Sequence, residues 1–257
     1  MNNTKIELLG KEFETNSSGK CFIINIESYK KDGVVVAFYE PFCLVKCNYV
    51  NLYSGRVSNP MLPKLYGKGF LGVGEYSTTV NKREYGLWSG ILERCYSLEY
   101  KRKQPTYKDA TICKEWLNFQ NFATWCNEQP FFNAKDDKQR YYQLDKDILV
   151  RGNKIYSPDT CCFVPNEVNK LLTLRGLARG DLPIGVCRQK GTGKFLSQCN
   201  YFGSRKHLGS FKTPQEAYVA YKIFKEYYIK EVAEKWKGEI DDRAYSSLIK
   251  YEISEDE

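Results

Sequence analysis

The segment that decides the fold of the C-terminal part of the chain is DLPIGVCRQKGTGKFLSQCNYFGSRKHLGSFKTPQEAYVAYKIFKEYYIKEVAEKWK, residues 181–237. It holds three strand-like runs, 184–189, 195–201 and 206–211, separated by turns that contain glycine. A long helix is expected after Thr213, because Pro and Glu in the next three positions complete a capping box. The segment therefore predicts a three-stranded antiparallel sheet that one helix covers on one face.

The uncovered face of this sheet is the expected binding surface. Strand alternation directs the odd-numbered residues 195–199 toward the helix, so Gln198 and Asn200 point outward. Residues 181–215 hold six basic residues and one acidic residue, a net charge of +5. Amide side chains can pair with adenine in the DNA major groove, and basic residues such as Lys190 and Lys194 can hold the phosphates.

Short motifs in this segment resemble the AP2 DNA-binding domain. They are Ile184-Gly185-Val186, Gly193-Lys194-Phe195, Leu208-Gly209-Ser210-Phe211, Thr213-Pro214-Gln215-Glu216-Ala217 and Ala220-Tyr221. The resemblance implies that duplex DNA is read by the sheet. The DNA-facing positions that it implies are Arg188, Gln198, Asn200, Arg205 and His207. His207 replaces a tryptophan of the family and Asn200 replaces a basic residue, so the family's target sequence is not expected here.

A second set of motifs lies upstream. Leu144-Asp145-Lys146-Asp147, Gly152-Asn153 and Tyr156-Ser157-Pro158-Asp159-Thr160-Cys161 resemble the ββα-metal hairpin of phage HNH homing endonucleases. The resemblance implies a bacteriophage origin, catalytic roles for Asp145, Asp147 and Asn153, and Mg²⁺ held by the two aspartates if the hairpin is active.

The general base of such a nuclease is missing from this hairpin. Leu144 stands where the family has its histidine, and the chain's one histidine, His207, lies in the AP2-like segment. A nuclease or nickase would then need a lysine such as Lys146 or Lys154, or the metal alone, in its place. Loss of a general base typically lowers the rate by about 10²–10⁴-fold. The alternative is a hairpin that rests on DNA without cleaving it.

Composition points to the same kind of partner. The 257 residues carry a net charge of +8, but residues 238–257 have seven acidic and two basic residues, so the first 237 carry +13. Such a basic surface favours a polyanion, most simply nucleic acid. No apolar run approaches membrane-spanning length. The ten cysteines include no CxxC pair, so we expect no zinc. No signal-peptide pattern is expected at residues 1–10, and the aromatic content is high, so we expect reduced thiols in a cytoplasmic protein.

The predicted fold class is α+β, in four parts. They are a small β module at 1–76, a helical region with the degenerate HNH-like hairpin at 77–175, the AP2-like domain at 181–237 and an acidic tail at 238–257. In the β module, Lys31-Asp32-Gly33 is a predicted hairpin turn with Gly at positive φ. Apolar residues recur at helical spacing through 83–128, interrupted by an expected basic loop, Lys101-Arg102-Lys103.

Three functions follow from these expectations. The first is a phage-type protein that reads duplex DNA, with or without metal-dependent nicking. The second is a catalytically inactive regulator that occupies a DNA site. The third is a protein-interaction or inhibitor module that uses the β module or the acidic tail, which could also fold back on the basic face.

Overall fold

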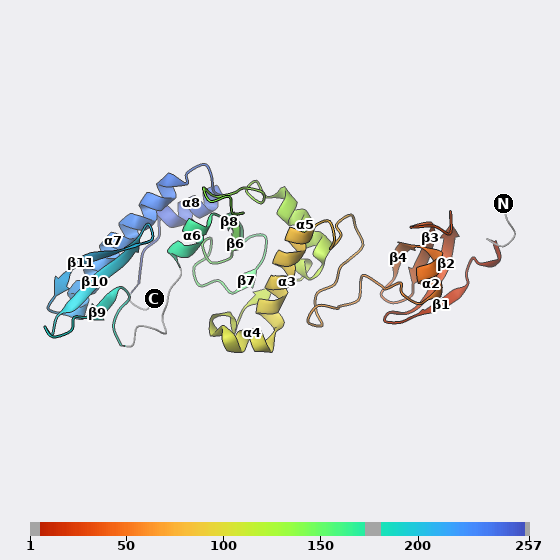
Figure 1. Cartoon of the computed structure of the whole chain (residues 1–257), viewed down its shortest axis with the longest axis horizontal. Coiled ribbons are helices and arrows are strands. Elements are labelled where there is room, and N and C mark those ends of the chain that lie inside the picture. The colour runs from red at the N-terminus through yellow and green to blue at the C-terminus, as the bar shows by residue number, and fades with distance from the viewer. Residues whose placement is uncertain (1–5, 173–180, 255–257) are drawn as a thin grey trace. The chain divides into compact units, whose positions relative to one another are not determined.

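The computed structural model describes residues 6–172 and 181–254. It is a mixed α+β structure in two compact units (Figure 1). The first unit comprises residues 1–127 together with 154–157, and the second comprises 128–153 and 158–257. The boundary therefore falls inside the region 77–175. Residues 173–175 of that region, and Glu255, Asp256 and Glu257 of the acidic tail, lie outside the described residues.

The first unit opens with an antiparallel sheet in the order β1-β2-β3-β4. The strands are β1 (Glu12–Thr15), β2 (Gly19–Ile26), β3 (Val34–Phe38) and β4 (Cys43–Cys47), and α2 (Tyr49–Tyr53) follows them. Strands β2, β3 and β4 match the strand-like runs that the sequence predicts at 21–26, 34–39 and 42–47, and β1 is additional. Alternate residues such as Cys21, Ile23, Val34 and Val36 are buried in one core, so the predicted β module is present.

The turn between β2 and β3 differs from the prediction. Asp32, not Gly33, adopts the left-handed conformation, with φ of 57°. Gly33 is required for a different reason, because a Cβ atom there would lie 2.1 Å from Ser28 Oγ and 2.4 Å from Ser28 O. A short polar residue such as aspartate tolerates positive φ, so the turn forms without glycine at that position.

The rest of the first unit is mostly helical, as the spacing of apolar residues predicts. Its elements are α3 (Lys82–Tyr96), α4 (Leu98–Lys103), η1 (Pro105–Tyr107), β5 (Thr111–Ile112), η2 (Glu115–Leu117) and α5 (Phe119–Glu128). The indole N–H of buried Trp88 donates to the carbonyl of Trp116 at 2.7 Å. The expected basic loop 101–103 is instead the last turn of α4, where Lys103 pairs with Glu99. Basic residues stabilise the C-terminal end of a helix, which explains the difference.

One short strand joins the first unit from much later in the chain. Strand β7 (Ile155–Tyr156) pairs in parallel with β5, and the N–H groups of Thr111 and Cys113 donate to the carbonyls of Lys154 and Tyr156. Tyr156 is buried. The first unit is therefore completed by residues that follow the start of the second.

The second unit begins with a small ββα arrangement. Strand β6 (Gln143–Asp145) pairs antiparallel with β8 (Cys162–Val164), and helix α6 (Asn166–Leu171) follows. Asp145 lies opposite Cys162 in this register. Phe132 packs against Phe163, with ring centroids 5.2 Å apart. The hairpin thus has a hydrophobic support formed by its own strand and the preceding loop.

The sheet predicted over residues 181–237 is present, in the order β11-β10-β9. The strands are β9 (Val186–Arg188), β10 (Phe195–Tyr201) and β11 (Ser204–Phe211), and all pairings are antiparallel. Helix α7 (Pro214–Lys235) has the expected capping box between Thr213 and Glu216. Val186 and Cys199 from the sheet, and Ile184 just before β9, share a core with Tyr218 and Tyr221 from the helix.

The C-terminal segment differs from the expected tail. Residues Asp242–Ile249 form helix α8, whose N-cap is Asp241, and Ala244 and Leu248 of this helix are buried. Ile253 is 4% exposed and belongs to the core shared by the sheet and α7. The acidic residues therefore lie on a packed segment, because apolar residues at helical spacing alternate with them.

No helix within residues 6–172 and 181–254 combines the length and apolar character needed to cross a membrane.

Candidate nucleic-acid interface

The middle strand β10 has two chemically different faces, as the alternation predicts. Ser197 and Cys199 are buried on the side of α7, and Phe195 packs against the same core. Asn200 is exposed and Gln198 is half-buried. We call the side away from α7 the outward face; it is defined by Leu196, Gln198 and Asn200 and their cross-strand partners.

The register of β10 with β11 brings four predicted residues together. Gln198 lies opposite His207, and Asn200 lies opposite Arg205. Directly opposed residues in an antiparallel pair share one face of the sheet. The outward face therefore carries two amide side chains beside an imidazole and a guanidinium, on neighbouring strands.

A β-bulge maintains this arrangement. The register shifts between Ser197 and Gln198, so Leu208 has no direct partner and Gly209 lies opposite Ser197. Leu208 packs against the core under α7. A bulge adds one residue to one strand, which allows His207 to stay outward while Leu208 turns inward.

Ser210 and Cys187, which both lie opposite Leu196, also belong to the outward face and were not predicted. Ser210 lies opposite Leu196, and its hydroxyl is 3.0 Å from Gln189 Oε1, to which it can donate. The Gln198 amide donates to Cys187 Sγ at 3.2 Å. Strand alternation alone predicts that Leu196 faces outward, like Gln198. That Ser210 lies opposite Leu196 is known only from the register of β10 with β11, which includes the bulge.

The basic residues of the segment lie at different places. Lys190 and Lys194 are exposed in the turn between β9 and β10, next to the outward face. Arg188 lies opposite Phe195, and its guanidinium is 5.3 Å from the centroid of that ring. Because Phe195 faces the helix side, the structure separates Arg188 from the amide group.

The three hairpin residues expected to be catalytic are engaged within the hairpin. Asp145 Oδ1 accepts from the backbone N–H groups of Asp147 and Ile148, at 2.7 and 2.8 Å. Asp147 Oδ1 forms an ion pair with Lys146 Nζ at 2.5 Å. The Asn153 amide donates to the Lys146 carbonyl at 2.8 Å, and Lys146 Nζ donates to the Asn153 carbonyl at 3.0 Å.

These hydrogen bonds and the ion pair bear on whether the hairpin could bind Mg²⁺. Burial raises the pKa of Asp145, although its two backbone hydrogen bonds act in the opposite direction. The Asp147 carboxylate faces an ammonium group, and the Asn153 Nδ2 group is bound to the Lys146 carbonyl. Mg²⁺ needs free oxygen ligands, so this arrangement does not fit a prepared magnesium site. The described residues also contain no cluster of three or more His, Cys, Asp or Glu suited to a metal ion.

Lys146 is well suited to a structural role. Its side chain is 9% exposed and bridges Asp147 and the backbone of Asn153, which closes the loop between these residues. Lys146, one of the two lysines expected to replace the missing histidine, is therefore held by these contacts inside the loop. Lys154, the other predicted substitute, lies in the segment assigned to the first unit.

Comparisons of the chain with protein-family models, with curated proteins and with solved structures gave no significant match.

Proposed function

We propose that this protein binds duplex DNA in the major groove through the outward face of β9, β10 and β11. The observation that carries the proposal is the pairing of Gln198 with His207 and of Asn200 with Arg205 on the face that α7 leaves uncovered. A β-ribbon of this kind fits the width of the major groove. The resemblance of the segment to AP2 domains is a second, independent support.

The side chains have distinct expected roles in this complex. Glutamine and asparagine can form paired hydrogen bonds with adenine, and arginine can do so with guanine. Arg205, Gln198 and Asn200 are therefore proposed to read bases. Lys190 and Lys194 lie in the adjoining turn, where they can neutralise phosphates and position the sheet without reading sequence.

The test is a binding selection followed by titration of variants. The full chain selects its preferred site from random duplexes, and Gln198→Ala and Arg205→Ala are then titrated on that site and on a scrambled duplex. Each variant is expected to lose about 1–3 kcal/mol of binding free energy on the preferred site only. Lys194→Ala should weaken binding to both duplexes alike and lower the salt dependence by about one phosphate contact.

The matched control is Lys68→Ala, which removes an exposed positive charge in the first unit. It should change neither affinity nor sequence preference. Equal losses on both duplexes for Gln198→Ala, Arg205→Ala and Lys194→Ala would contradict base reading by the sheet.

A cleavage assay distinguishes a protein that only occupies its DNA site from one that cleaves it. We infer that the protein acts by occupying DNA, as a regulator of a phage genome in the host cytoplasm, because the hairpin residues bond to one another. Incubation of supercoiled DNA with protein and Mg²⁺, Mn²⁺ or EDTA should leave the DNA intact. Metal-dependent nicks that disappear in Asp145→Ala would instead establish a nickase.

A further inference from the structure

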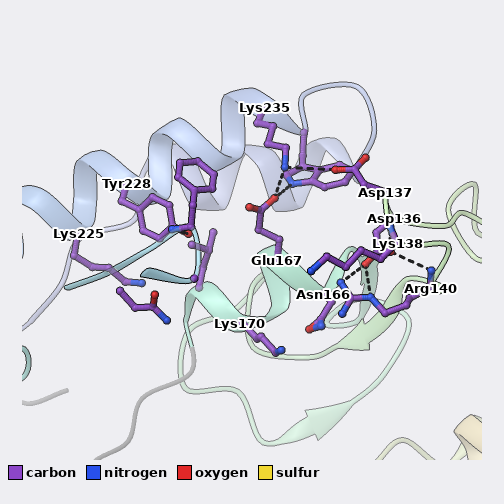
Figure 2. A pocket seen from close by; sticks show the side chains of 15 residues that line it. Asp136, Asp137, Lys138, Arg140, Asn166, Glu167, Lys170, Lys225, Tyr228 and Lys235 are labelled. Carbon is purple, nitrogen blue, oxygen red and sulfur yellow. Dashed lines mark hydrogen bonds and ion pairs between the residues drawn. The ribbon is translucent and has the colours of Figure 1, made fainter. Parts of the chain in front are cut away.

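A pocket of about 410 Å³ opens within the second unit, at one end of the sheet. It is bounded by α6, α7, the turn 136–140 and the turn 202–203 between β10 and β11 (Figure 2). This volume is within the range of about 300–1,000 Å³ that is usual for small-molecule sites. Asn200, which lies on the outward face, also lines the pocket.

The lining carries an excess of positive charge, with five basic and three acidic residues. Two of the cations are already paired: Arg140 with Asp136, and Lys235 with Glu167. The others are Lys138, Lys170 and Lys225. Among the residues that the structure describes, none of these three has a carboxylate partner.

These three lysines come from three different elements around the pocket (Figure 2). Burial lowers the pKa of Lys225, which lies beside the Tyr228 ring at 5.3 Å from its centroid. A partly buried ammonium group without an opposite charge is unfavourable. A bound anion would supply the missing partner for Lys225, and the exposed Lys138 and Lys170 lie at the same pocket.

Asn166 needs a hydrogen-bond donor, which is a different requirement from that of the lysines. This residue of α6 is only 6% exposed and lines the pocket, yet its Oδ1 has no hydrogen-bond partner in the described part of the chain. An amide oxygen accepts hydrogen bonds and cannot bind a phosphate oxygen. The pocket therefore offers cations for an anion and, separately, an acceptor for an N–H or O–H donor.

An aromatic side chain completes the set. Phe202 lines the pocket, is 44% exposed and has φ of 45°, a left-handed conformation that is unusual for a bulky residue. Its N–H donates to the Tyr228 hydroxyl at 3.2 Å, and the two ring centroids are 5.1 Å apart. Strained residues of this kind cluster at functional sites, and an exposed ring can stack on a nucleobase.

We propose that this pocket binds one nucleotide. The phosphate pairs with Lys138, Lys170 and Lys225, the base stacks on Phe202, and a base N–H or amino group donates to Asn166 Oδ1. The nucleotide is either a free mononucleotide or an unpaired nucleotide of DNA held by the sheet. The first source does not depend on DNA binding by the outward face.

The test is calorimetric titration of the full chain with dAMP, with deoxyribose 5-phosphate and with inorganic phosphate. One molecule of dAMP should bind per chain, more tightly than either of the other two. Lys225→Gln should weaken dAMP binding roughly tenfold or more, since it removes one charge-assisted contact. Lys230→Gln, which removes an exposed lysine of the same helix outside the pocket, should leave dAMP binding unchanged.

Asn166→Leu separates base recognition from phosphate binding. It replaces the unpartnered amide with an apolar group of similar size, and its melting temperature shows whether the fold is intact. The variant should bind dAMP about as weakly as the wild type binds deoxyribose 5-phosphate, and its binding of the latter should be unchanged. Equal binding of dAMP by wild type, Lys225→Gln and Asn166→Leu, or no dAMP binding at all, would overturn the proposal.

Two further experiments identify the source of the nucleotide and test the pocket separately from DNA binding by the outward face. Arg205→Ala should bind the preferred duplex more weakly but retain dAMP binding, so failure of either proposal is seen independently of the other. A duplex with one unpaired 5′ adenine should bind more tightly than its blunt counterpart, and dAMP should remove that difference if DNA supplies the nucleotide. If dAMP binds but the two duplexes bind equally, the ligand is the free mononucleotide.

Discussion

Gly185 shows how a single residue can determine the contact between the sheet and α7. Its φ is 77°, and a Cβ atom there would lie 2.0 Å from Cδ2 of Tyr221. Both the backbone conformation and the close approach of the ring exclude other side chains. The tyrosine can then pack directly over the start of β9, in the core that supports the outward face.

Replacement of this glycine is expected to destabilise the second unit. Gly185→Ala should lower the free energy of unfolding by about 3 kcal/mol, since a left-handed alanine and an overpacked core each contribute. Gly191→Ala is the matched control, because Gly191 also has φ of 77° but nothing within 4 Å of its Cβ position. Chemical denaturation should show a loss of only about 1 kcal/mol for the control. Equal losses would mean that the contact with Tyr221 is unimportant.

The turn 136–140 of the second unit depends on the carboxylate of Asp136. Asp136 Oδ1 accepts from the backbone N–H groups of Lys138 and Arg140, and Oδ2 accepts from the Arg140 guanidinium. These bonds, of which the Arg140 side chain contributes most, lower the pKa of Asp136 below its ordinary value. The turn 136–140 is thus held by one side chain that must stay ionised.

This turn should lose its stabilisation in acid. A carboxyl group with a lowered pKa binds protons less readily in the folded state, so its contribution is present above about pH 4 and disappears as the pH falls through the lowered pKa. Asp136→Asn should therefore melt at a lower temperature than the wild type at pH 7. The two melting curves should converge as the pH is lowered below about 4. A gap that is independent of pH would contradict this explanation.

Helices and strands could be predicted where neighbouring residues in the sequence determine them. The capping box of α7 and the limits of β10 are read from neighbouring residues, and both are confirmed. The turn between β10 and β11 contains the expected glycine, Gly203, but also Phe202, and both residues have positive φ. Nothing local favours phenylalanine there; its contacts with Tyr201 and Tyr228 do, and those depend on the tertiary fold.

The candidate interface was predictable to the same extent. Alternation along one strand indicates Gln198 and Asn200, but their partners depend on the bulge at Leu208. The position of Arg188 depends on the register with β10. The pocket could not be predicted at all, because Lys138, Asn166, Lys225 and Phe202 come from separate elements that only the folded second unit brings together.

Because β7 pairs with β5, the stability of the first unit depends on residues 154–157, which are distant in sequence. Tyr156→Ala removes a buried ring and should destabilise the first unit by about 3 kcal/mol. Amide hydrogen exchange should show lost protection at Thr111 and Cys113, whose N–H groups bond to the segment 154–156. Ile155→Ala, at a site 48% exposed, should have a much smaller effect. Unchanged protection in Tyr156→Ala would show that β5 is stable without β7.

The ten cysteines, all free thiols, give the molecule a chemical reporter at the proposed interface. Eight are buried, and only Cys113 and Cys187 are partly accessible. Cys187 lies opposite Leu196 and accepts the Gln198 amide, so a maleimide that reaches it would sit on the outward face. In a Cys113→Ser background, alkylation of the folded protein should be confined to Cys187 and slowed by bound duplex. The rate of that single reaction would then measure occupancy of the sheet directly, with no need to label the DNA.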